Sequence, residues 1–155
     1  VGHSAGGAAA VIAAAADATA LAVVGLDAVD DSEGVLTGLA PTLSVPVHAI
    51  FGEISGCNQS GSAVAPLGTA PDSTLLQVVE ADHCDFEDPY DPLCSILCSG
   101  SNALFTDDAI RHTIRSLLTA ALLWRSGLEP AGEGWWTAGG GPHDDLLAAG
   151  AIGAL

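Results

Sequence analysis

The chain has 155 residues, of which 49% are apolar and 14% charged, a composition typical of one globular domain rather than of a disordered segment. Nineteen acidic residues stand against three arginines, and the formal net charge of −16 disfavours nucleic acids and anionic lipid surfaces as partners. The apolar runs are too short to span a bilayer, so no membrane span is expected.

Helices, strands and loops are predicted in alternation along the first half of the chain. Residues 4–16 are small and apolar and predict a helix entered by a sharp turn. Residues 21–26 and 45–51 are apolar runs typical of buried parallel strands, and residues 74–79 predict a third such strand. Between the last two strands, residues 52–71 are rich in Gly, Ser and Pro, which indicates a long loop with room for one short helix.

The rest of the chain predicts a long helix and a tail. Asp107–Arg125 carries apolar residues at helical spacing, and Thr106 can cap its first turn. Residues 127–155 are rich in Gly and Ala and predict an irregular tail, partly docked by Trp135 and Trp136. Strands that alternate with helices or long loops imply an α/β fold with a parallel sheet and right-handed crossovers.

Three residues with catalytic chemistry follow the ends of predicted strands. Ser4 stands at the exit of the first strand, Asp27 follows the second, and His83 follows the last. In parallel sheets the functional residues gather at the carboxyl ends of the strands. We therefore expect these three side chains to lie at one edge of the sheet.

The sequence Gly-His-Ser-Ala-Gly around Ser4 fits the pattern G-x-S-x-G. This pattern is typical of a strained strand-to-helix turn that projects a nucleophilic serine out of the sheet. Gly2 and Gly6 are expected to remove side chains that would collide across the turn. The helix that follows directs its first N–H groups at the reacting oxygen, so the N–H of Ala5 is the candidate oxyanion donor.

Of the five histidines, His83 is the candidate general base. It lies in the loop between the last strand and the long helix, where the chain order serine, acid, histidine places the base. His3 is expected to pack beneath the serine, and His48 to be a structural residue within its strand. His112 is expected to face solvent from the long helix, and His143 belongs to the tail.

Two carboxylates are candidates for the acid that orients the histidine. Asp27 and Glu53 each follow a buried strand, so the residues alone leave both open. Asp30 and Asp31 are interpreted as solvated loop carboxylates or helix caps.

The four cysteines, Cys57, Cys84, Cys94 and Cys98, allow three interpretations. An even count indicates two disulfides, with three possible pairings, in an oxidising compartment such as that of a secreted or periplasmic protein. Four buried thiols and a zinc site are the alternatives, although the close C-x-x-C pairs of zinc sites are absent from the sequence.

Three segments resemble the chlorophyllase and platelet-activating-factor acetylhydrolase-like branch of the α/β-hydrolases. This branch more distantly resembles bacterial polyester hydrolases and dienelactone hydrolases. The segments are residues 2–7, 25–30 and 82–86. The resemblance implies that Ser4 is the nucleophile, Asp27 the acid and His83 the base. Ala5 stands where chlorophyllases carry arginine, which argues against chlorophyll as the substrate.

The resemblance also implies a domain organisation. Residues 1–126 are expected to be the C-terminal half of an α/β-hydrolase catalytic domain, and residues 127–155 are the tail that the resemblance leaves unexplained. The early strands and the loop that supplies a second oxyanion donor are expected upstream of Val1, so we expect these 155 residues alone to be inactive.

The function implied is that of a serine hydrolase that cleaves small-molecule carboxylic esters of neutral or apolar character through an acyl-enzyme. No metal or organic cofactor is implied. Alternatives are a lipase, thioesterase or peptidase on the same fold, and a non-catalytic binding domain of this fold. Phe86, Tyr90 and the loop around Cys94 and Cys98 could line the substrate pocket or could simply pack beneath the loop.

Overall fold

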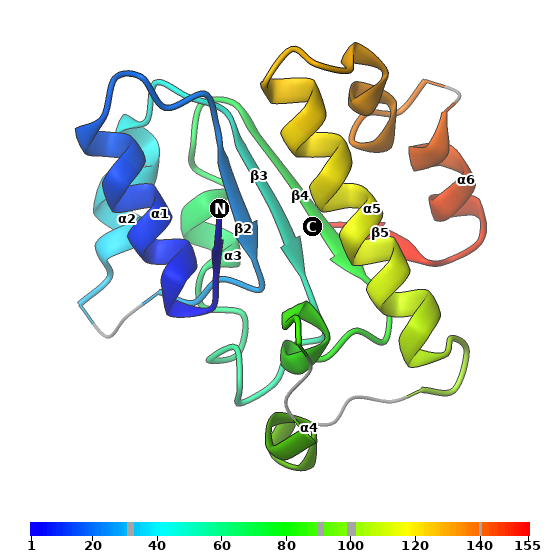
Figure 1. Cartoon of the computed structure of the whole chain (residues 1–155). Coiled ribbons are helices and arrows are strands. Elements are labelled where there is room, and N and C mark those ends of the chain that lie inside the picture. The colour runs from blue at the N-terminus through cyan, green and yellow to red at the C-terminus, as the bar shows by residue number, and fades with distance from the viewer. Residues whose placement is uncertain (31–32, 90–91, 99–101, 140) are drawn as a thin grey trace.

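The computed structural model describes residues 1–30, 33–89, 92–98, 102–139 and 141–155 (Figure 1). Its centre is a five-stranded sheet in the order β1-β2-β3-β4-β5, in which the first four strands are parallel and the last is antiparallel. The strands are β1 (Gly2–His3), β2 (Val23–Leu26), β3 (Val47–Phe51), β4 (Ser73–Val78) and β5 (Ile152–Ala154). The α/β class and the three predicted parallel strands are confirmed.

Helices cover both faces of the sheet. Figure 1 shows α1 and α2 on one side of the strands, and α5 and α6 on the other. The α-helices are α1 (Ala5–Ala16), α2 (Val35–Leu39), α3 (Val64–Leu67), α4 (Pro92–Cys98), α5 (Asp107–Arg125) and α6 (Pro142–Ala148). The described residues also include the 3-10 helices η1 (Ala40–Thr42), η2 (His83–Phe86) and η3 (Pro130–Trp135). Within the described residues, no helix is long and apolar enough to cross a membrane.

Strand β3 shows why the central strands are mostly apolar, because all five of its residues are buried. Val47, Ala49 and Phe51 belong to the core under α1, α2 and α3, whereas Ile50 belongs to the core under α5. Because successive side chains of a strand point to opposite faces, a strand buried on both sides has a nearly continuous apolar run, which His48 alone interrupts in β3.

Helix α5 has the predicted bounds. The Oγ1 atom of Thr106 accepts a hydrogen bond from the Ala109 N–H at 3.3 Å, which is the predicted cap. One stripe of the helix is buried in the core: Ile110, Thr113, Ile114, Leu117, Ala120 and Ala121.

The prediction of an irregular tail after residue 126 is wrong. Residues 127–155 include η3, α6 and β5, and β5 pairs with β4 through Gly153 opposite Gln77. The expected docking by tryptophan is confirmed for Trp136, whose buried indole donates to the Leu117 carbonyl at 3.0 Å. Trp136 and Ile152 belong to the same core as α5, so the tail and the sheet share one hydrophobic interior. Gly and Ala give no periodic pattern from which these short elements could be read.

Candidate active site

Ser4 lies in a strained turn between β1 and α1. Its backbone has φ 56° and ψ −128°, a conformation that L-residues adopt only where the surroundings impose it. The surroundings here are backbone atoms: the Ser4 N–H donates to the Leu26 carbonyl at 3.0 Å, and the Ser4 carbonyl accepts from Gly7 at 2.9 Å and Val29 at 3.2 Å. The turn is thereby fixed against the end of β2.

Two glycines allow this turn to close: Gly2, as expected, and Gly7, which takes the role expected of Gly6. A Cβ atom on Gly2 would lie 1.9 Å from the Gly6 carbonyl oxygen, and one on Gly7 would lie 2.4 Å from the Cβ of Ala28. A Cβ atom on Gly6 would meet no described atom within 4 Å. The expectation that Gly6 relieves a collision is therefore wrong, and Gly7 takes that role because it faces the loop after β2.

The structure brings Ser4, His83 and Asp27 into one chain of hydrogen bonds. His83 Nε2 lies 3.0 Å from Ser4 Oγ, and His83 Nδ1 lies 2.6 Å from Asp27 Oδ2. Asp27 is fully buried and His83 is 8% exposed. With Asp27 as a carboxylate, Nδ1–H of His83 must donate to it, so Nε2 of the neutral ring accepts from the Ser4 hydroxyl. This is the arrangement that makes a serine hydroxyl nucleophilic.

Asp27 and not Glu53 is the carboxylate in contact with the histidine. Asp27 Oδ1 accepts from the Gly52 N–H at 3.0 Å and from Asn58 Nδ2 at 3.2 Å, so its buried charge has three donors. Glu53 is exposed, and its Oε1 accepts from the Glu80 N–H at 3.1 Å. The residues alone left these two carboxylates open, whereas the resemblance assigned Asp27 as the acid. Neither indicated Asn58, because a Gly- and Ser-rich loop gives no signal for a buried amide.

Asp30 is a buried residue rather than a solvated loop carboxylate. Its Oδ1 accepts from the Leu36 N–H at 2.9 Å, at the beginning of α2. The capping alternative therefore fits it, because the first N–H groups of a helix have no partner within the helix. Asp31 lies outside the described residues.

The 3-10 helix η2 holds His83 in place. The Asp82 carboxylate accepts from the N–H of Cys84 at 2.7 Å and of Asp85 at 3.2 Å, and the Asp85 side chain accepts from the Asp82 N–H. Asp85 also pairs with Nε of Arg111 on α5 at 3.1 Å. Burial raises the pKa of the Asp85 carboxyl, and its hydrogen bonds to Asp82 and Arg111 act in the opposite direction.

The other histidines have structural positions. His3 lies under the site with its Nε2 3.1 Å from the His83 carbonyl oxygen, and burial, followed by the neighbouring His83, lowers the pKa of His3. His48 is buried in β3, where burial and then Arg125 lower its pKa to about 4. His112 is exposed on α5, as expected, and His143 pairs with Asp144.

The four cysteines form two disulfides, Cys57–Cys98 and Cys84–Cys94. The sulfurs of Cys84, Cys94 and Cys98 lie within 4.8 Å of one another, but each is bonded to another sulfur and so is not a thiolate that could bind zinc. Both bonds tether α4, which lies beyond the carboxyl ends of the strands (Figure 1). Two disulfides are compatible with an extracellular protein.

Phe86 packs in the core instead of facing an open pocket. It is 8% exposed, and its ring lies 6.2 Å from that of His3. Of the expected pocket-lining residues, Tyr90 lies outside the described part of the chain. On α4, Leu93, Ile96 and Leu97 are exposed.

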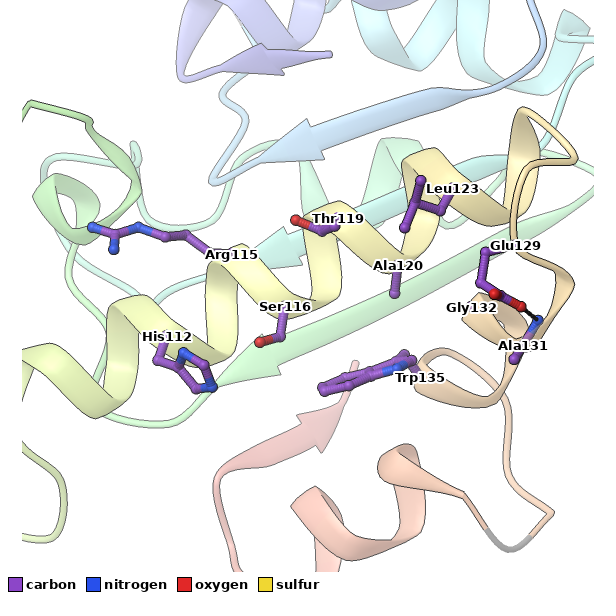
Figure 2. A pocket seen from close by; sticks show the side chains of 10 residues that line it. All are labelled: His112, Arg115, Ser116, Thr119, Ala120, Leu123, Glu129, Ala131, Gly132 and Trp135. Carbon is purple, nitrogen blue, oxygen red and sulfur yellow. Dashed lines mark hydrogen bonds between the residues drawn. The ribbon is translucent and has the colours of Figure 1, made fainter.

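A cavity of about 370 Å³ lies between α5 and the segment that contains η3. Figure 2 shows Ser116 and Ala120 of α5 pointing toward Trp135, with Arg115 and Glu129 also at the cavity. None of the residues that line this cavity belongs to the hydrogen-bonded chain of Ser4, His83 and Asp27. The cavity is therefore a separate feature and not the space in front of Ser4.

Comparison of the chain with models of known protein families and with curated protein sequences found no match.

Proposed function

We propose that this chain carries the catalytic residues of a serine hydrolase that cleaves carboxylic esters of neutral or apolar substrates. The observation that carries the proposal is the continuous chain Ser4–His83–Asp27, with distances of 3.0 Å and 2.6 Å, on a strained strand-to-helix turn. A mostly parallel sheet with the three residues at the carboxyl ends of its parallel strands supports an α/β-hydrolase fold, in the chlorophyllase and platelet-activating-factor acetylhydrolase-like branch that the sequence resembles.

In the first step Ser4 Oγ attacks the ester carbonyl carbon while Nε2 of His83 takes the hydroxyl proton. The resulting imidazolium is stabilised by Asp27, which accepts from Nδ1 and keeps the ring oriented. When the tetrahedral intermediate collapses, the alcohol leaves with the proton held at Nε2, and the acyl group stays on Ser4.

The Ala5 N–H supplies one hydrogen bond to the oxyanion. Ala5 is the first residue of the 12-residue helix α1, and the first N–H groups of a helix have no partner within it. The positive end of the helix dipole points in the same direction and favours the developing negative charge.

In the second step a water molecule attacks the acyl-enzyme with His83 again as the base. The carboxylic acid product leaves, and the proton returns from Nε2 to Ser4 Oγ. The net charge of −16 disfavours anionic substrates, which is why a neutral or apolar ester is proposed.

The proposal is tested with p-nitrophenyl acetate and butyrate on the full-length protein. Ser4→Ala and His83→Ala are expected to lower kcat by about 10⁴-fold or more, and Asp27→Asn by about 10³- to 10⁴-fold. Glu53→Gln is the matched control for the carboxylate and is expected to stay within a few-fold of wild type.

Three results would change the proposal. If Glu53→Gln is the crippled variant, the hydrolase survives and the acid assignment and family branch are wrong. Faster cleavage of peptide amides or thioesters than of esters would replace esterase by peptidase or thioesterase. If wild type cleaves none of these and Ser4 does not react with a fluorophosphonate, the hydrolase is refuted in favour of a binding domain.

A further inference from the structure

Asn58 lies at the centre of the loop after β3 and beside the candidate site. It is 1% exposed, and both ends of its amide are occupied. Its Nδ2 donates to Asp27 Oδ1 at 3.2 Å and to the Glu53 carbonyl at 2.8 Å. Its Oδ1 accepts from the Ser55 N–H at 2.9 Å and the Gly61 N–H at 3.1 Å.

These four contacts fix which way the amide points. Oδ1 faces two backbone donors, and Nδ2 faces two oxygen acceptors, so a flipped amide would put like groups against each other at all four contacts. The N–H group toward Asp27 is therefore required by the rest of the loop.

The two oxygens of Asp27 are divided between different partners. Oδ2 accepts from His83, whereas Oδ1 accepts from Asn58 and from the Gly52 N–H. Because Asp27 is fully buried, the two donors on Oδ1 set the plane of the carboxylate and so direct Oδ2 at the histidine.

The loop is built to hold Asn58 where it is. Gln59, Ser60 and Gly61 follow it with φ of 51°, 58° and 70°, and this run of left-handed residues returns the chain so that Gly61 reaches Asn58 Oδ1. The first two are not glycines, so the turn costs free energy and persists because its surroundings impose it. The residue before Asn58 is Cys57, which is tied to α4 by a disulfide.

We infer that Asn58 is a positioning residue for the proposed hydrolysis: its side-chain N–H fixes the Asp27 carboxylate, and Asp27 in turn fixes the His83 ring. The kinetic consequence rests on the proposed function, but the hydrogen bond itself can be tested without a substrate. Asn58 acts through Asp27 and does not touch the reacting atoms, so it should influence kcat rather than KM.

The decisive variant is Asn58→Asp, which keeps the shape and the acceptor oxygen and replaces the donor by a second carboxylate. The titratable groups in contact with one another are then residues 58 and 27 and His83, while the Glu53 side chain points to Glu80. Two buried carboxylates this close share one proton, and while they share it residue 58 can still donate to Asp27. Loss of that proton removes the donor and adds repulsion.

We expect kcat of Asn58→Asp to fall with rising pH, to roughly tenfold or more below wild type on the alkaline plateau, with KM within about twofold. Asn102→Asp makes the same chemical change at an exposed asparagine on the segment before α5 and should leave the pH profile unchanged. If Asn58 only shaped the loop, the two profiles of Asn58→Asp and wild type would stay parallel, and that result overturns the inference.

A measurement on wild type covers the case in which Asn58→Asp does not fold. The side-chain amide protons of Asn58 should shift in NMR spectra as His83 is titrated, and those of Asn102 should not. This shift requires no hydrolase activity, so its absence refutes the Asn58 inference, whereas a shift in a protein without esterase activity refutes only the proposed function.

Discussion

Ser4 is held by backbone atoms of its own turn, of β2 and of the loop after β2, whereas Asp27 and His83 also depend on side chains and on disulfide-tethered segments of other loops. The turn at Ser4 requires glycine at position 2, because a Cβ atom on Gly2 would lie 1.9 Å from the Gly6 carbonyl oxygen. Asp27 instead depends on Asn58, which lies 31 residues further along the chain. The turn at Ser4 is therefore sensitive to substitutions that add side-chain atoms. The positions of Asp27 and His83 are sensitive to the loss of hydrogen bonds and disulfides.

The largest effect is expected from Gly2→Ala, which adds a methyl group to the crowded side of the turn. Because the clash is with a backbone carbonyl that cannot rotate away, we expect a loss of more than about 4 kcal/mol in the free energy of unfolding, or no folded protein. Urea denaturation followed by circular dichroism measures this. A variant as stable as wild type would show that the turn at Ser4 is not fixed by backbone packing.

The second-largest effect is expected from removal of the Cys57–Cys98 disulfide, which tethers the loop that contains Asn58. In Cys57→Ser/Cys98→Ser the closed segment of 41 residues is released, and the free energy of unfolding should fall by about 4 kcal/mol on the chain-entropy argument. Esterase activity should fall as well, because Asn58 follows Cys57 directly. For stability alone, the comparison is Cys84→Ser/Cys94→Ser, whose separation of 10 residues predicts a smaller loss of about 3 kcal/mol. Equal activity in wild type and the variant without the Cys57–Cys98 bond would show that this disulfide does not help to position Asn58.

His48 is buried in β3 against Trp124 and Trp136 and belongs to neither region, so its titration reports on the fold and not on the loops of the site. Its pKa is lowered from 6.5 to about 4 in the folded protein, so between these values the unfolded chain binds a proton that the folded one does not. Stability is therefore complete above pH 6.5 and is lost as the pH falls toward 4, by at most about 3 kcal/mol from this residue.

His48→Gln cannot take up that proton and should lack this part of the acid destabilisation. The measurement is the free energy of unfolding of wild type and variant at several values between pH 7 and pH 4. Parallel curves for the two proteins would mean that His48 does not cause the acid sensitivity.

The smallest effect is expected from Gly6→Ala. A Cβ atom there meets no described atom within 4 Å, so the stability should stay within about 0.5 kcal/mol of wild type or rise slightly, since alanine favours a helix more than glycine does. Thermal unfolding of this variant beside Gly2→Ala compares an open position of the turn at Ser4 with a crowded one. A loss of stability as large as that of Gly2→Ala would contradict the finding that a Cβ atom on Gly6 has free space.

The difference between the turn at Ser4 and the loops that hold Asp27 and His83 also decides what could be predicted from the sequence. The turn at Ser4 is encoded by neighbouring residues, so the G-x-S-x-G pattern before an apolar helix was enough to predict it. Strands β2, β3 and β4 were predictable because burial favours mostly apolar runs, although β3 contains His48 and β4 contains Thr74 and Gln77. The role of Gly7 was not predictable, because it depends on Ala28 from another element.

Features that depend on contacts between distant residues remained open or were missed. Asp27 and Glu53 have the same local signature, and only the path of the loops separates the one that contacts His83 from the one that contacts Glu80. Asn58 carries no pattern at all, since its importance comes from a buried carboxylate elsewhere in the chain. The pairing of the cysteines likewise required the position of α4.

Strand β5 has a consequence for self-association. The edge of a sheet exposes a row of unpaired N–H and C=O groups, and a long apolar edge can pair with the same edge of another molecule and nucleate aggregates. Without β5, this edge would be the six-residue strand β4 with its apolar Leu75, Leu76 and Val78. The three residues of β5 pair with Leu76, Gln77 and Val78 and leave a shorter edge there that contains Gly153. The C-terminal tail thus protects this side of the sheet from intermolecular pairing.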